Sequence, residues 1–135
     1  MPREFRKSPP ELVLKAVLQH IDDAVVFKSP DGIITLWNRA AAELFGYTPP
    51  EVIGEPADLL IAPKERRHWH QCEKLIRGGG VMCRRVRAVR IGKDGRRIRV
   101  TMTATVIDKT RPARSEIMEL YRAVGACDRT VKSVS

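Results

Sequence analysis

Aromatic residues and cysteines are scarce in this sequence. Phe, Trp and Tyr make up 5% of its 135 residues, and only three cysteines occur, Cys72, Cys83 and Cys127. The cysteines are odd in number, widely spaced and in no CxxC pair, which indicates neither a disulfide framework nor a structural zinc site. We therefore predict free thiols and no metal site.

Long apolar runs are also missing. None approaches the roughly 20 residues that a membrane-spanning helix needs, and the N-terminus MPREFRKSPPE lacks the apolar stretch of a signal peptide. The overall composition, 43% hydrophobic and 30% charged, is typical of a soluble globular protein. We expect a single cytoplasmic domain that makes no membrane contact.

Motifs that carry catalysis are absent as well. The sequence contains no G-x-S-x-G, no Gly-rich phosphate loop and no carboxylate pair that stands out, and its Ser, His and acidic residues are scattered. We predict that the chain is not an enzyme.

Positive charge is what the sequence has in excess. Lys and Arg outnumber Asp and Glu by 25 to 16, for a net charge of +9, which suits a nucleic acid, an acidic membrane surface or an acidic protein. Eight basic residues lie between Arg84 and Arg99 against one acid, Asp94, in a segment expected to form strands. No aromatic residues are interleaved there for base stacking, so we do not expect nucleic acid as the partner. A basic protein-docking face and a merely solvated face both remain open.

The first 20 residues divide into a segment and a helix. We expect residues 1–10 to be flexible. Residues 8–11 read SPPE, which matches an S-x-x-E capping box with proline at the first helical positions. The apolar residues that follow at helical spacing are Leu12, Val13, Ala16 and Val17. The pattern predicts a short amphipathic helix over about residues 9–20.

A hairpin and three helices should come next. Residues 24–28 and 33–37 are apolar runs on either side of the turn Ser29-Pro30-Asp31-Gly32, which predicts a β-hairpin. Asn38 is a plausible N-cap for an alanine-rich helix that ends at Gly46. Residues 48–51 form a second capping box, and a longer helix is predicted over residues 63–78.

Three further strands are predicted over residues 81–91, 96–107 and about 118–127. In the second of them, Ile98, Val100 and Met102 alternate with Arg97, Arg99 and the threonines, as in a half-buried antiparallel strand. The order of elements predicts an α+β fold, with an antiparallel sheet and helices on one face.

Five local motifs in this order resemble the PAS family over roughly residues 12–130. They are the Asp31-Gly32 turn, N-x-A-A-x-x-L-F-G-Y from Asn38, E-V-I-G from Glu51, K-D-G at Lys93-Asp94-Gly95, and the terminal D-x-T at Asp128 and Thr130. The segment RPARSEIMELY departs from the family because it lacks the usual glycine turn.

The resemblance implies a fold and a set of residues. The expected fold is a five-stranded antiparallel sheet with short helices packed on one face, in a domain over residues 11–131 followed by a tail or truncated linker at 132–135. The motif residues Asn38, Gly46, Asp94, Gly95, Asp128 and Thr130 should be structural. A ligand pocket between helices and sheet is expected to be lined by Leu60, Cys72, Ile76, Val100 and Met102.

The predicted helix at residues 63–78 also resembles the helix that carries the proximal histidine in haem-binding oxygen sensors of this family. It contains His68 and His70, so haem b is a possible cofactor. The number of residues after Pro63 favours His70 as the haem ligand. Helical spacing favours His68 instead, because it places His68 on an apolar face with Cys72 and Ile76.

Other observations leave the cofactor unknown. The arginine that those sensors hold near the bound gas is replaced here by Val86, and the N-C-R motif of flavin photosensors is missing. Both histidines could also be ordinary side chains of a charged helix, an interpretation that stays open.

The function expected from the resemblance is that of a sensory and interaction module in a signal-transduction protein. It would bind a small ligand and form a homodimer through the N-terminal helix and the outer face of the sheet. Its output domain would be a kinase, a cyclase or a transcriptional regulator. The alternatives are a haem-based gas or redox sensor, and a ligand-free basic module that docks on protein or nucleic acid.

Overall fold

The chain folds into an antiparallel sheet whose inner face is covered by helices. The computed structural model describes residues 5–79 and 82–124. Its elements in chain order are α1 (Pro10–His20), β1 (Ala24–Lys28), β2 (Ile34–Trp37), α2 (Arg39–Phe45), α3 (Pro49–Val52), η1 (Ala57–Leu60), α4 (Pro63–Gly79), β3 (Cys83–Ile91), β4 (Arg97–Val106), η2 (Pro112–Arg114) and β5 (Ile117–Ala123). The predicted α+β class and five-stranded antiparallel sheet are confirmed.

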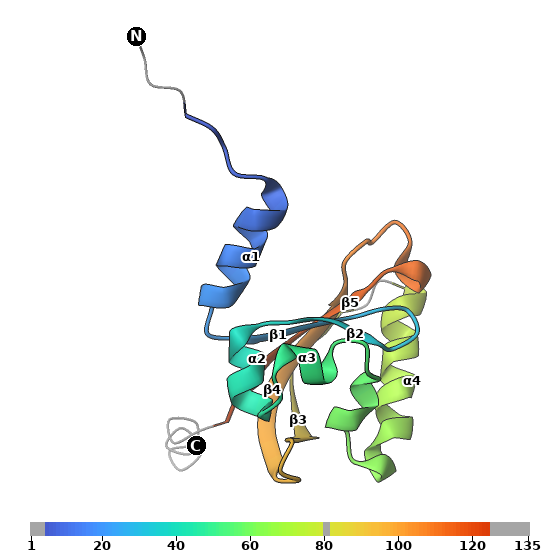
Figure 1. Ribbon diagram of the computed structural model, residues 1–135. Coiled ribbons are helices and arrows are strands. Elements are labelled where there is room, and N and C mark those ends of the chain that lie inside the picture. The colour runs from blue at the N-terminus through green and yellow to red at the C-terminus, as the bar shows by residue number, and fades with distance from the viewer. Residues whose placement is uncertain (1–4, 80–81, 125–135) are drawn as a thin grey trace, which may run out of the picture.

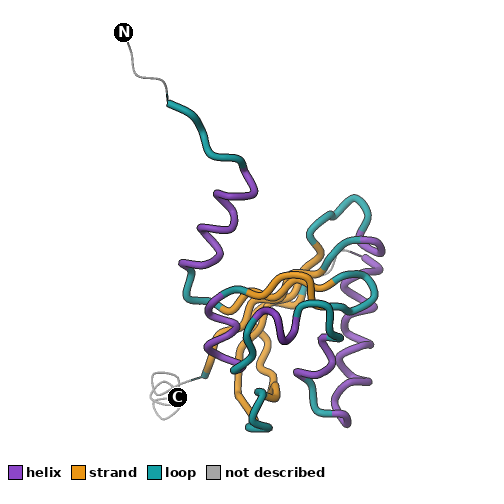
Figure 2. Tube along the Cα trace, viewed as in Figure 1, coloured by secondary structure: helices purple, strands orange, loops and turns teal. Residues whose placement is uncertain are grey.

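The first and last described strands lie beside each other at the centre of the sheet. The strand order is β2-β1-β5-β4-β3, and every neighbouring pair is antiparallel. Figure 2 shows the strands as one layer. β2 and β3 are therefore the edge strands. β5 pairs with both β1 and β4, so a displacement of β5 also displaces these two strands.

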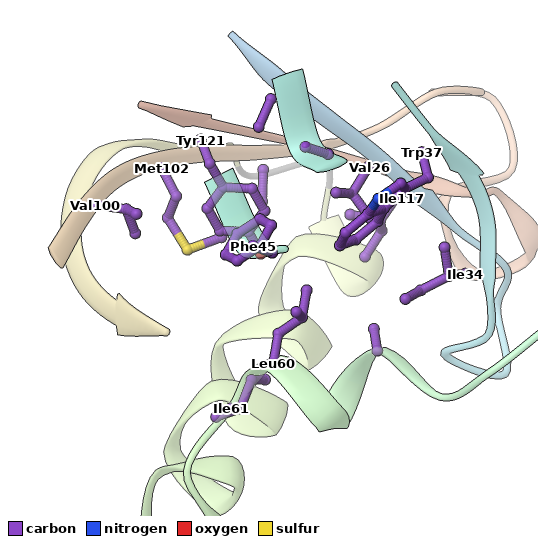
Figure 3. Packing of buried hydrophobic residues seen from close by; sticks show 14 of the residues in the cluster. Val26, Ile34, Trp37, Phe45, Leu60, Ile61, Val100, Met102, Ile117 and Tyr121 are labelled. Atoms are coloured by element: carbon purple, nitrogen blue, oxygen red, sulfur yellow. The ribbon is translucent and has the colours of Figure 1, made fainter. Parts of the chain in front are cut away.

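Helices α2, α3, η1 and α4 lie on one face of this sheet (Figure 1). Their apolar side chains meet those of β1, β4 and β5 in one hydrophobic cluster, part of which is drawn in Figure 3. Along β4 the alternation is the predicted one, because Val100 and Met102 are buried whereas Arg97 and Arg99 are exposed. The inner face of the sheet is thus the one that can hold a site.

Helix α1 stands apart from this layered body (Figure 1). It begins at Pro10 with Pro9 at the N-cap, and no side chain caps it, so the capping box predicted at residues 8–11 is wrong. The physical reason is that Pro9 itself takes the N-cap position, which moves Ser8 out of reach. None of the residues of α1 is buried.

Two short 3₁₀ helices, η1 and η2, were not expected from the sequence. The last strand begins at Ile117, one residue earlier than predicted, and its predicted end at residue 127 lies outside the described residues. The glycine missing before this strand is replaced by the η2 turn, in which the Arg114 N–H donates to the Arg111 carbonyl.

Candidate functional site

Three strands each place one charged side chain on the inner face of the sheet. Side chains alternate between the two faces of a strand, so Lys28 follows Ala24 and Val26 inward, Glu119 follows Ile117, and Arg90 follows Ala88. All three are buried, with 2%, 1% and 3% of Lys28, Glu119 and Arg90 exposed. Charged residues are rarely this buried unless they are paired.

Helix α4 lays further polar side chains over the same region. Trp69, Glu73 and Arg77 recur every four residues and therefore share the helix face that looks at the sheet. Trp69 is buried, and the side chains of Glu73 and Arg77 are each 14% exposed. We call Lys28, Trp69, Glu73, Arg90, Glu119 and Tyr121 the buried polar cluster.

An ion-pair bridge joins α4 to the two central strands of the sheet. Lys28 Nζ lies 2.7 Å from Glu73 Oε1 and 2.9 Å from Glu119 Oε2. The Tyr121 hydroxyl donates to the other oxygen of Glu119. One lysine thus connects β1, β5 and α4.

Arg77 extends the attachment of α4 to the loops at one end of the sheet. Its guanidinium donates to the Ser115 carbonyl at 2.6 Å and to the Ser29 carbonyl at 3.2 Å. Its Nε lies 3.7 Å from Glu73, one turn earlier on the helix.

The pKa values of Lys28 and Glu119 indicate that both groups of this ion pair are charged. Burial alone would lower the pKa of Lys28, but the carboxylates of Glu119 and Glu73 outweigh that effect and raise it. Burial would likewise raise the pKa of Glu119, yet Lys28, the Tyr121 hydroxyl and Arg90 together lower it. Burial and the neighbouring Glu119 raise the pKa of Tyr121 well above its usual value, so this phenol stays protonated and can donate.

Arg90 and Trp69 form the second half of the cluster. The Arg90 guanidinium lies 5.4 Å from the centre of the Trp69 ring and 5.8 Å from that of Tyr121, and Lys28 Nζ also lies 5.4 Å from the Trp69 ring. These separations are in the range of cation–π contacts. Two cations thus lie close to the indole in the interior.

The side chains predicted to line a pocket gather next to this cluster. Leu60, Ile76, Val100 and Met102 belong to the hydrophobic core between η1, α4 and the sheet, and Cys72 packs against them. The site is therefore apolar on the side of these residues and charged on the side of Lys28, Arg90 and Glu119.

The two histidines do not lie in this site. His68 is exposed, 3.8 Å from Cys72, and His70 is exposed and hydrogen-bonded to Asp58 at 2.8 Å. The prediction that His68 lies on the buried face of the helix is wrong, because the buried face passes through Trp69, between the two histidines. A haem iron needs an imidazole that faces the interior, so neither residue fits haem and no step is derived through that cofactor.

Asn38 connects three segments around the start of α2. Its Oδ1 accepts from the backbone N–H groups of Ala41 at 3.0 Å and Val25 at 2.9 Å, and its Nδ2 donates to the carbonyls of Leu18 and Asp23. It therefore caps α2 and ties it to β1 and to the end of α1.

The other motif residues hold turns. Gly46 ends α2 in the left-handed region, with φ of 87°, and the neighbouring Lys93 N–H donates to the Phe45 carbonyl. Asp94 accepts from the Arg96 N–H at 2.9 Å, and Gly95 has φ of 84° in the β3–β4 turn. Asp128 and Thr130 lie outside the described residues.

Two further findings limit the chemistry. Within residues 5–79 and 82–124, no group of three or more His, Cys, Asp or Glu side chains could hold a metal ion. In the same part of the chain, every helix is too short or too polar to cross a membrane.

A comparison with models of protein families agrees with this architecture. The model of the PAS fold matches residues 13–112, which is most of the chain. The chain belongs to the PAS family. Among curated proteins, a probable serine/threonine-protein kinase of Dictyostelium discoideum is 39% identical over 66 residues, which cover 47% of this chain and 4% of the kinase. The chain thus spans a small part of that relative's length.

Solved PAS domains share the fold at low identity. A PAS domain from Colwellia psychrerythraea has a TM-score of 0.70 at 21% identity, over 84% of this chain and 96% of that one. A domain of a sensory box sensor histidine kinase/response regulator from Geobacter sulfurreducens has a TM-score of 0.67 at 18% identity, over 83% and 92%. At these identities the likeness establishes the fold alone.

Sequence reasoning missed the polar half of this PAS site. The available signal was the alternation within the strands, since Lys28, Arg90 and Glu119 occupy positions that continue an inward-facing apolar series. In the sequence alone, Arg90 resembles the other arginines of its strand, of which Arg84, Arg85 and Arg87 are exposed.

Proposed function

We propose that this chain is the sensory module of a cytoplasmic signalling protein and that it binds a small ligand between α4 and the inner face of the sheet. The observation that carries the proposal is the buried polar cluster, in which Lys28 bridges Glu73 on α4 and Glu119 on β5. Burying such charges costs desolvation energy that a purely apolar core would not incur. Their presence at the position of the family's ligand site supports a role in recognition.

The same ion pairs suggest how a bound ligand would act. A ligand that engages one member of the cluster competes with the Lys28 bridge and changes the preferred position of α4 on the sheet. Because β5 pairs with both β1 and β4, a shift at Glu119 reaches both neighbouring strands. This structural shift would be transmitted along β5 to an output domain, which would be a kinase, a cyclase or a transcriptional regulator.

A homodimer through α1 and the outer face of the sheet completes the proposal. Leu12, Val13, Leu14 and Val17 are each at least 50% exposed on α1. The outer face carries half-buried apolar side chains, namely Phe27, Leu36, Met118 and Leu120. An apolar groove of about 520 Å³ runs between α1 and β2, lined by Leu14, Leu18 and Leu36 among others. A second copy of α1 would cover these surfaces.

Thermal unfolding in the presence of a library of small water-soluble molecules tests the ligand half of the proposal. A ligand that binds the folded state at 100 times its Kd stabilises it by about 2.7 kcal/mol, which raises Tm in a concentration-dependent way. We expect such molecules to be found. A library that leaves Tm unchanged throughout would argue for an interaction module without a ligand.

A further inference from the structure

Two N–H groups in the interior have no acceptor. They are Trp69 Nε1 and Arg90 Nε, on residues that are 6% and 3% exposed, and no acceptor for either lies within the described residues. The other indole of the chain behaves differently, because Trp37 Nε1 donates to the Tyr47 carbonyl at 2.9 Å. Buried donors in folded proteins are nearly always hydrogen-bonded, so two orphaned donors in one cluster indicate a missing acceptor.

The rest of the Arg90 side chain is also poorly satisfied. Its terminal nitrogens donate to the Val89 carbonyl at 3.2 Å and to the Met102 sulfur at 3.0 Å, a weak acceptor. It forms no ion pair with any residue that the structure describes, whereas Lys28 in the same cluster has two carboxylates. Glu119 helps to raise the pKa of Arg90, but no ion pair joins the two groups. A buried guanidinium without an ion pair calls for an anion.

The ion pairs of the cluster leave Arg90 out. Glu73 and Glu119 both pair with Lys28, and Arg90 has no ion pair among the described residues. Glu65, half-buried on α4, adds only the weakest of the influences that raise the pKa of Arg90 and makes no ion pair with it. A carboxylate beside Arg90 would give this guanidinium a direct partner.

The sheet edge beside Arg90 is not fully covered. Val86 and Ala88 face inward next to Met102 and Val100, yet Val86 is 39% exposed and Ala88 is half-buried, whereas their β4 neighbours are fully buried. The inner side of β3 is therefore the less covered side of this site. The rings of Trp69 and Tyr121 beside the guanidinium offer an apolar wall to its body.

We infer that this site binds a small monocarboxylate, whose oxygens accept from Arg90 Nε and Trp69 Nε1 while its apolar part lies against the aromatic rings. The guanidinium carbon of Arg90 lies 5.4 Å from the centre of the Trp69 ring, which is close enough for one small anion to contact both side chains. The inference rests on the proposed function, since it names the ligand class of the same site.

The two indole N–H signals in a ¹⁵N-correlated NMR spectrum provide the test, with Trp37 as an internal control. Acetate, butyrate and benzoate are titrated, each against its primary amide, and Trp69→Phe assigns the signals. We expect at least one carboxylate to shift the Trp69 signal saturably and to leave that of Trp37 in place. The matching amide should bind at least about tenfold more weakly, because it lacks the charge.

Two variants tie the result to Arg90. Arg90→Lys keeps the charge but removes the Nε donor, and it should weaken binding about tenfold or more. Arg87→Lys, an exposed arginine of the same strand, is the matched control and should bind like the wild type. Equal binding of acid and amide, no shift with any of the three acids, or full binding by Arg90→Lys would overturn the inference. If neutral molecules from the thermal screen still bind, the sensory proposal survives; if none does, both fall.

Discussion

At the scale of single residues, Lys28 is the most consequential side chain of the interior. It forms ion pairs with both Glu73 and Glu119. Lys28→Met keeps most of the volume and removes the charge, which leaves two carboxylates buried near each other. Removing one partner of a buried ion pair costs about 3–5 kcal/mol, so we expect a loss of that size in urea unfolding.

The control for Lys28 is an ion pair on the surface. Arg39 and Glu43 form an i,i+4 pair whose side chains are 68% and 66% exposed. Arg39→Met should cost less than about 0.5 kcal/mol. If the two variants lost similar stability, the buried bridge would contribute no more than a surface contact.

Glu119 gives the fold a dependence on pH. Its pKa is lowered from the ordinary value of 4.5, because Lys28, Tyr121 and Arg90 together outweigh burial. A carboxyl whose pKa is depressed in the folded state stabilises that state at pH values above its unfolded pKa, and this stability is lost as the pH falls through the folded value. We expect the free energy of unfolding to fall steeply below about pH 4.5. Glu119→Gln should show a shallower fall, and an identical slope in both proteins would contradict this account.

The sequence predicts the residues of the caps and turns more completely than those of the buried polar cluster. Asn38, Gly46 and Gly95 were found because caps and left-handed turns have local signatures in the chain. Trp69 and Arg90 were not, because their role depends on which faces of α4 and β3 meet in space. The sequence singles out the two histidines of α4, whereas the buried position between them belongs to Trp69.

At the scale of elements, α2 depends on a single amide side chain. Asn38 is 1% exposed and makes four hydrogen bonds that join α1, β1 and α2. Asn38→Ala removes the cap and leaves the N–H groups of Val25 and Ala41 without their acceptor. We expect a loss of about 2–4 kcal/mol in the free energy of unfolding.

Thr48 provides the matched control for Asn38. It is the N-cap of α3 at an exposed position, where its hydroxyl donates to Glu51 at 3.1 Å. Lys93 and the Thr48 N–H lower the pKa of Glu51 to about 2, so this carboxylate stays charged at neutral pH. Thr48→Ala should cost about 1 kcal/mol or less. Equal losses in the two variants would show that Asn38 acts as an ordinary cap.

Most elements were predictable because their signals are local. The hairpins and α4 follow from apolar periodicity and turn residues. The cap of α1 and the two 3₁₀ helices were missed, since Pro9 can sit at or before the first turn and since single turns such as η1 have no periodicity to detect.

At the scale of the whole molecule, the exposed apolar side of α1 predicts a dimer. Leu14 is 51% exposed and lines the groove beside β2. We expect light scattering coupled to size exclusion to give the mass of a dimer for the wild type and of a monomer for Leu14→Glu. Leu75→Glu, at a 68% exposed position on α4, should remain a dimer. A wild type that is monomeric at high concentration would remove α1 from the interface.

The central claim is that a ligand binds between α4 and the sheet. Locating the site of a bound molecule tests this claim most directly. A molecule that raises Tm in the thermal screen is titrated into ¹⁵N-labelled protein, and the amide and indole shifts are mapped. The account predicts that the largest changes fall on Trp69, on Glu73 and on the inner positions of β3 and β5, with α1 and Trp37 unaffected. Changes confined to α1 and the outer face, with the Trp69 indole unmoved, would contradict it.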